Sequence, residues 1–325
     1  MISLKEIKGQ SNAVRLLSNS LKKLSFSKSY LFSGPDGVGK GLTVKAFLLS
    51  ILCPEKDAEH MACLTCPVCK RIAASEHPDI HWIKPEKNKS IKIDDIRSLR
   101  DSMNLKPYEA ILNAGIIEDA HLMTEEAQNA LLKVLEEPPG NSILVLITNK
   151  KELLLPTVVS RCAEVRFSFL SIKETTDIVT KNLDLEPSSI EVLSYFSQGS
   201  PGTALKMVEE GVLARKKELI SLIEDIVKEE APYCLNWDSE NRDVLFEDIE
   251  MVIMFLRDVL FGIEGYSAKV LDRSFFQTGI YRHFSKYNAE KIYKIVVELI
   301  KVKKALFGNA NPKIVSRVLP GILMG

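Results

Sequence analysis

A glycine-rich segment near the N-terminus has the residue types and spacing needed to bind phosphate. Gly34, Gly37 and Gly39 precede Lys40, between a short apolar run at 30–32 and a helical pattern at 42–52. Glycines let backbone N–H groups close around phosphate oxygens, and the N-terminus of the following helix adds partial positive charge. A lysine at this point can reach the outer phosphates. The segment therefore predicts a phosphate-binding loop between a strand and a helix.

The residue after this lysine departs from the usual pattern. A serine or threonine normally follows the lysine and holds magnesium, but Gly41 stands there. Thr43 does not replace it, because two further residues along a helix turn a side chain roughly 200° away. The loop could still hold phosphates, and the sequence leaves open whether ATP binds.

Polar residues follow two predicted strands that are apolar throughout. Glu118 and Asp119 come directly after the strand at 114–117, and Thr148 follows the strand at 143–147. The carboxyl ends of parallel strands lie beside a phosphate loop. One acid would normally hold magnesium through water, and the next would polarise the attacking water. Thr148 could sense the nucleotide, or it could simply belong to a turn at the end of the strand.

Four of the six cysteines have the spacing of a metal site. Cys53, Cys63, Cys66 and Cys69 form two successive C-x-x-C steps with a cysteine ten residues upstream. A tetrahedral zinc site with four thiolate ligands accounts for this spacing most simply, and four free thiols are the alternative. Few aromatic or basic residues surround the cluster, which favours a structural role over nucleic-acid recognition.

The composition is that of an ordinary globular protein. Of the 325 residues, 46% are hydrophobic, and 43 lysines and arginines balance 43 aspartates and glutamates. The neutral balance limits any nucleic-acid contact to a local patch. No apolar run reaches the roughly 18 residues that span a bilayer, and the N-terminus lacks the apolar centre of a signal peptide. We therefore expect a cytoplasmic protein with no membrane partner.

The order of elements predicts two kinds of structure. Strands and helices alternate up to the strand at 164–167, which indicates a parallel sheet flanked by helices. From Ser171 onwards the pattern is helical only. The fold class is therefore α/β followed by helical segments.

Several motifs together resemble one family. Besides the features above, they are Ile7-Lys8-Gly9-Gln10, His77-Pro78-Asp79, Leu105-Lys106-Pro107-Tyr108, the run from Asn129 to Pro139, Ser160-Arg161-Cys162, and Asn309-Ala310-Asn311-Pro312 before a last helix. The chain resembles the delta-prime subunits of bacterial DNA polymerase III clamp loaders, which are AAA+ proteins. The resemblance is close over residues 1–210 and weaker beyond, where it depends on the helical pattern and the Asn-Pro motif.

The resemblance implies three domains. The first is a RecA-like AAA+ module of residues 1–168 with an inserted zinc knuckle at about 53–69. A helical lid of residues 169–212 and an all-helical collar of residues 213–325 would follow, and the collar would join subunits in a ring. The partners implied are the motor (gamma/tau) and delta subunits, the sliding clamp, and primed DNA through the complex.

Three positions differ from the motor subunits of this family. Gly41 replaces the serine or threonine, Glu118-Asp119 replaces Asp-Glu, and Gly202 stands where the motor carries a lid arginine. Arg161, which in the family serves as an arginine finger for a neighbour's ATP, is present. The resemblance therefore implies a stator, that is, a clamp-loader subunit that is not by itself a competent ATPase and that supplies Arg161 to the ATP site of a neighbouring subunit.

Alternatives remain for the function and for Arg161. The chain could be an active ATPase of the motor type, or a nucleic-acid-binding zinc protein. Arg161, between a predicted turn at 155–157 and the strand at 164–167, could instead form only a surface ion pair.

Overall fold

The computed structural model describes residues 2–23, 25–57, 61–86, 89–227, 237, 241–266, 270 and 278–324. These residues form two compact units, one of residues 1–175 and 198–203, the other of residues 176–197 and 204–325. The predicted division into three domains remains a prediction. Cys234 lies outside the described residues.

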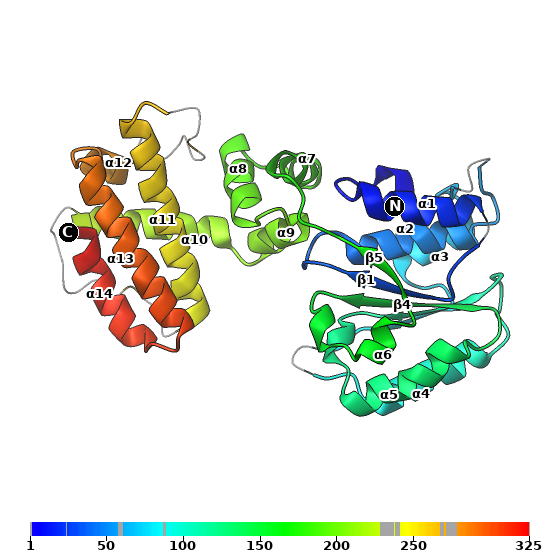
Figure 1. The fold of residues 1–325 in the computed structure, drawn as a ribbon. Coiled ribbons are helices and arrows are strands. Elements are labelled where there is room, and N and C mark those ends of the chain that lie inside the picture. The colour runs from blue at the N-terminus through cyan, green and yellow to red at the C-terminus, as the bar shows by residue number, and fades with distance from the viewer. Residues whose placement is uncertain are drawn as a thin grey trace. The chain divides into compact units, whose positions relative to one another are not determined.

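The first unit contains a five-stranded parallel sheet with helices on both faces (Figure 1). Its strands are β1 (Ser29–Ser33), β2 (Ile80–Ile83), β3 (Asn113–Ile117), β4 (Ser142–Thr148) and β5 (Ala163–Arg166). Their order in the sheet is β2-β3-β4-β1-β5. All residues of β1, β3 and β4 are buried, as the continuous apolar runs predict for strands covered on both faces. The predicted α/β class is confirmed, and the parallel sheet fits a RecA-like fold.

Helices cover both faces of this sheet (Figure 1). One layer contains α1 (Ser11–Lys22), α2 (Lys40–Leu52) and α3 (Pro67–Ala74), and the other contains α4 (Ile93–Asn104), α5 (Glu125–Glu136) and α6 (Pro156–Val159). Helix α2 is buried on nearly all sides because it packs against α1, α3 and β4. Short 3-10 helices lie at η1 (Leu4–Glu6), η2 (Ala120–Leu122) and η3 (Lys151–Leu153).

The register of the strands brings the predicted site residues to one edge of the sheet. Ser33, the last residue of β1, is level with Thr148 on one side and Arg166 on the other. Ile117 at the end of β3 is level with Leu146 of β4. Because all strands are parallel, the segments that follow β1, β3 and β4 leave the sheet at the same edge.

The second unit is helical. Its helices are α7 (Ile172–Asn182, which begins in the first unit), α8 (Pro187–Phe196), α9 (Pro201–Glu209, likewise), α10 (Val212–Val227), α11 (Arg242–Ile263), α12 (Gly279–Phe284), α13 (Ala289–Phe307) and α14 (Pro312–Met324). A large apolar core joins α10 to α14, with α13 packed against α11 and α14. No helix in the described part of the chain is long and apolar enough to cross a membrane.

Candidate phosphate-loop edge and cysteine cluster

The loop from Gly34 to Lys40 joins the end of β1 to the start of α2, as predicted. Gly37 and Gly39 have φ values of 67° and 95°, which are costly for residues with a Cβ atom. Gly39 is the residue before α2, and Lys40 is the first residue of the helix. The N–H of Gly34 donates to the carbonyl oxygen of Thr148 at 3.2 Å, which ties the loop to β4. The sequence therefore builds the geometry of a phosphate loop at the predicted place.

The side chain of Lys40 is occupied by the loop itself. Its ammonium group donates to the carbonyl oxygens of Gly34 at 2.8 Å and Pro35 at 2.5 Å. Burial lowers the pKa of Lys40 below its ordinary value, while the charges of Asp36, Asp119 and Glu118 act in the opposite direction. In this conformation the loop's own carbonyl groups receive the hydrogen bonds that Lys40 would give to a phosphate.

The start of α9, far along the chain, contacts this loop. The N–H of Gly202 donates to the carbonyl oxygen of Gly37 at 2.8 Å, and the hydroxyl of Ser200 donates to the carbonyl oxygen of Asp36, also at 2.8 Å. A Cβ atom on Gly202 would lie 2.8 Å from the Cα of Gly37. The loop and the start of α9 therefore contact each other, through main-chain atoms at Gly202 and through the hydroxyl of Ser200.

The two acids after β3 do not both face the loop. Glu118 accepts a hydrogen bond from the indole N–H of Trp82 at 3.1 Å and lies 3.7 Å from the ammonium of Lys84. Both partners come from the β2 side of the sheet, away from β1. Asp119 has a left-handed φ of 48° and precedes η2.

Thr43, which the sequence excluded as a magnesium ligand, donates its hydroxyl hydrogen to the carbonyl oxygen of Gly39 at 2.8 Å.

His121 belongs to this edge and was missed by sequence reasoning. Its Nδ1 lies 3.3 Å from the hydroxyl oxygen of Thr148, which also accepts the N–H of Lys150 at 3.1 Å. Burial lowers the pKa of His121, with Asp119 the largest opposing charge. Its position two residues after the acid pair was an available signal. Ser200 was missed as well, because the carbonyl oxygen that it contacts, that of Asp36, is 164 positions away in the chain.

Arg161 lies on the surface at the ends of two helices. It follows α6 and donates through Nη1 to the carbonyl oxygen of Thr157 at 3.0 Å, and through Nη2 to a carboxylate oxygen of Glu136 at 2.6 Å. Its side chain is 37% exposed. The segment at 155–157, predicted as a turn, instead begins the short helix α6. Arg161 therefore forms the surface ion pair that was its alternative role, with guanidinium N–H groups to spare.

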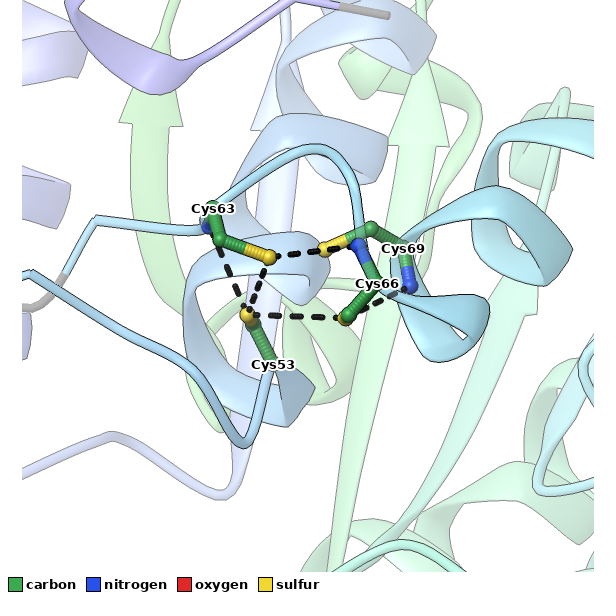
Figure 2. A group of neighbouring side chains, drawn as sticks. All are labelled: Cys53, Cys63, Cys66 and Cys69. Atoms are coloured by element: carbon green, nitrogen blue, oxygen red, sulfur yellow. Dashed lines mark hydrogen bonds between the residues drawn. The ribbon is translucent and has the colours of Figure 1, made fainter.

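The four predicted cysteines form one cluster (Figure 2). Their sulfur atoms all lie within 4.8 Å of one another, with Cys53 Sγ 3.6 Å from Cys63 Sγ and 3.9 Å from Cys66 Sγ. Tetrahedral zinc with four thiolates requires sulfur atoms about 3.8 Å apart. The cluster lies between the end of α2 and the start of α3, a helix not predicted from the sequence. The donor set and spacing fit zinc.

Backbone groups also support negative charge on these sulfur atoms. The N–H groups of Cys63, Cys66 and Cys69 point at the sulfur atoms of Cys53, Cys63 and Cys66, at 3.3 to 3.5 Å. The N–H groups of Thr65 and Cys66 lower the pKa of Cys63 to about 6, whereas burial raises the pKa values of Cys53 and Cys69. Cys162 lies apart from the cluster, and burial raises its pKa to about 12.

Comparisons with known proteins agree over most of the chain. A family model described as "DNA polymerase III, delta subunit" matches residues 9–171. The delta′ subunit of DNA polymerase III from Bacillus subtilis is 28% identical and aligns over 95% of each chain. The delta′ subunit from Pseudomonas aeruginosa is 31% identical over 67% of this chain and 68% of its own length.

A motor-type subunit is also similar. The tau subunit from Bacillus subtilis is 30% identical over 64% of this chain, which corresponds to 37% of the longer tau protein. The match to tau thus covers less of either protein than the match to the B. subtilis delta′ subunit. With the family model covering half of the residues, the chain belongs to the DNA polymerase III delta′ family.

Proposed function

We propose that this chain is the stator subunit of a bacterial clamp loader, which helps to load the sliding clamp onto primed DNA. In this proposal it works in a cytoplasmic hetero-oligomeric ring with delta and motor (gamma/tau) subunits, and its C-terminal helices form the collar of the ring. It supplies Arg161 to the ATP site of a neighbouring motor subunit and does not hydrolyse ATP itself.

One observation carries the proposal that the chain's own site is inactive: the phosphate loop is engaged by its own chain. The N–H of Gly202 is bonded to the carbonyl oxygen of Gly37, and the hydroxyl of Ser200 is bonded to the carbonyl oxygen of Asp36. A nucleotide would find Gly41 in place of the magnesium-holding hydroxyl. Glu118 is turned towards Trp82 and Lys84. These contacts support weak or absent ATP binding.

Arg161 supports the second half of the proposal. A guanidinium at the surface can reach the phosphate of another subunit, whereas one buried in its own fold cannot. An arginine supplied in trans raises phosphoryl-transfer rates by about a thousandfold or more, because it neutralises charge that develops in the transition state. Lysine would replace it poorly, since it lacks the planar fork of donors.

We propose that the cysteine cluster holds one structural zinc ion through Cys53, Cys63, Cys66 and Cys69. All four positions would be protein thiolates, so no place would remain for a catalytic water. The ion would supply a cross-link between α2 and α3.

Reconstitution of the complex tests the function directly. With Arg161→Ala, the chain should fold and assemble, while clamp- and DNA-stimulated ATP hydrolysis and clamp loading should slow. Activities equal to wild type would contradict the finger role.

The motor-type alternative has its own signature. It predicts magnesium-dependent turnover by the purified chain that disappears with Lys40→Ala. Similarity to tau over 64% of the chain is the observation that favours it. Salt-dependent binding of primed DNA by the chain alone would instead favour the nucleic-acid-binding alternative.

A further inference from the structure

Glu136 contacts Arg161, the residue that the proposed function assigns to the ATP site of a neighbouring subunit. Glu136 is the last residue of α5, and Arg161 follows the last turn of α6. The carboxylate accepts from Nη2 of Arg161 at 2.6 Å, and the carbonyl oxygen of Thr157 accepts from Nη1 at 3.0 Å. The guanidinium is therefore held at two of its nitrogen atoms, between the C-terminal ends of two helices.

The two helices beneath this pair are joined rigidly. Gln128, buried on α5, donates to the carbonyl oxygen of Leu153 at 3.3 Å and accepts the N–H of Leu155 at 2.7 Å. Leu135 and Val158, from α5 and α6, lie in the same apolar core. Buried contacts thus join the two helices, and the ion pair itself lies at the surface.

This ion pair contributes little to stability, because both partners are exposed. The side chain of Glu136 is 52% exposed and that of Arg161 is 37% exposed. Pairs of this kind have weak attraction in water and lose side-chain freedom when they form. The consequence for function is different. An arginine that is already ordered loses less freedom when it meets a phosphate in another subunit.

We propose that Glu136 is a positioning residue for Arg161, which holds the guanidinium ready for the ATP of the neighbouring subunit. The inference rests on the proposed function of Arg161. One carboxylate oxygen and one carbonyl oxygen occupy only part of the five N–H donors of an arginine. The remaining donors stay available to a phosphate while Glu136 keeps its hydrogen bond.

The test uses the reconstituted complex with stimulated ATP hydrolysis as the readout. At the ATP site that Arg161 serves, Glu136→Ala should lower kcat about fivefold and leave the KM for ATP within about twofold, since ordering a side chain is worth about this factor. Glu136→Gln keeps a neutral acceptor and should lose less. Arg161→Ala should lose far more, about a thousandfold at the site that it serves.

Two controls separate positioning from other effects. Glu137→Ala changes the adjacent exposed glutamate, for which the structure shows no bond to Arg161, and should leave kcat unchanged. The double variant Glu136→Ala/Arg161→Ala should be no slower than Arg161→Ala alone, because Glu136 acts only through the arginine.

The outcomes distinguish this inference from the function beneath it. If Arg161→Ala hydrolyses ATP as fast as wild type, both the finger role of Arg161 and the positioning role of Glu136 are wrong. If Arg161→Ala is slow but Glu136→Ala is not, Arg161 acts as the finger and the positioning role of Glu136 is wrong. The same conclusion follows if the losses in kcat from the two substitutions multiply in the double variant. A faster complex with Glu136→Gln would mean that the carboxylate competes with phosphate, which also overturns the proposal.

Discussion

The backbone N–H of Gly202 donates to the carbonyl oxygen of Gly37 at 2.8 Å, although 165 positions separate the two glycines in the chain. Neither residue has a side chain, and the lack of a side chain is what permits the contact. A Cβ on Gly37 would lie 2.2 Å from the hydroxyl oxygen of Ser200, and one on Gly202 would lie 2.8 Å from the Cα of Gly37. Position 202, where the resemblance leads us to expect an arginine in motor subunits, is here a main-chain contact with the phosphate loop.

Replacing Gly202 by alanine should therefore destabilise the first unit. The added methyl group meets backbone atoms of Gly37 that cannot rotate away, and overpacking of this kind costs about 1–3 kcal/mol. Gly41→Ala is the matched control, because nothing lies within 4 Å of its added Cβ and the residue is in the first turn of α2. It should be neutral or stabilising by about 0.5 kcal/mol. Urea unfolding measures both, and equal effects would contradict the contact.

Gly41→Thr should not create steady ATP hydrolysis in the isolated chain. The new hydroxyl would restore one magnesium ligand, but position 202 would still lack an arginine. Steady-state turnover with magnesium and ATP is the measurement. Lys40→Ala in the same background is the control for contaminating ATPases. Turnover in Gly41→Thr that disappears with Lys40→Ala would show that Gly41 alone had silenced the site.

Replacing Cys66 by serine should lower bound zinc from about one equivalent to less than half. It should also destabilise the first unit by at least about 2 kcal/mol, because the free energy of metal binding contributes to the free energy of folding. Cys162→Ser is the matched control, because Cys162 lies outside the cluster and should keep the zinc. Metal analysis and urea unfolding report the two effects. Wild-type protein with less than half an equivalent would contradict the zinc proposal.

The sequence was informative where the structural requirement is local. Three glycines before Lys40, between an apolar run and a helical pattern, are enough to predict the loop, because the loop's geometry depends on adjacent residues. Thr124 likewise caps α5 by accepting the N–H of Ala127, as its type and position predict. The cysteine spacing predicts a cluster because two C-x-x-C steps bring their thiols together within one turn of chain.

The sequence was silent where the partner is distant. Glu118 turns to Trp82 because β2 lies beside β3, and this order cannot be read from the strand itself. The contact between Gly202 and Gly37, and that between Arg161 and Glu136, join segments distant in the chain. Helix α3 is a different case, since Pro67 directly after the capping residue Cys66 was a usable sign of a helix start.

Glu164 should make the first unit sensitive to acid. Its carboxylate accepts a hydrogen bond from the hydroxyl of Ser33 at 2.8 Å, and both of its oxygens accept from the ammonium of Lys151. The guanidinium of Arg166 lies 3.0 Å from one of these oxygens. Burial opposes ionisation, but the bonds from Lys151, Arg166 and Ser33 outweigh it and lower the pKa of Glu164 to about 2 from an ordinary 4.5. A lowered pKa stabilises the fold above the unfolded-state value, and the effect is lost as the pH falls from about 4.5 towards 2.

Glu164→Gln should therefore lower the free energy of unfolding by up to about 3 kcal/mol at pH 6. The difference from wild type should shrink as the pH falls below about 4.5. Urea unfolding between pH 6 and pH 3 measures it, with the exposed Glu125→Gln as a control for loss of charge. A difference that stays constant over this range would show that the carboxylate is not held by these partners.

A buried ion pair should matter more to the second unit than an exposed pair on the same arginine. Arg215 donates to both oxygens of Asp248, at 3.0 and 2.6 Å, and the indole N–H of Trp237 donates to Asp248 at 2.9 Å. Asp248 is fully buried, whereas Glu218, the other partner of Arg215 at 3.2 Å, is 67% exposed. Bonds to Asp248 raise the pKa of Arg215. Removing the buried carboxylate leaves Arg215 and Trp237 without their acceptor.

Asp248→Ala should therefore cost about 3 kcal/mol or more, and Glu218→Ala at most about 0.5 kcal/mol. Each of the chain's two tryptophans lies in a different unit. In a Trp82→Phe background, fluorescence during guanidinium unfolding reports the second unit through Trp237 alone. Both variants lose one negative charge near the same arginine, so charge alone predicts equal losses. Equal losses in the free energy of unfolding would mean that burial and the bond from Trp237 do not make Asp248 more important for stability than Glu218.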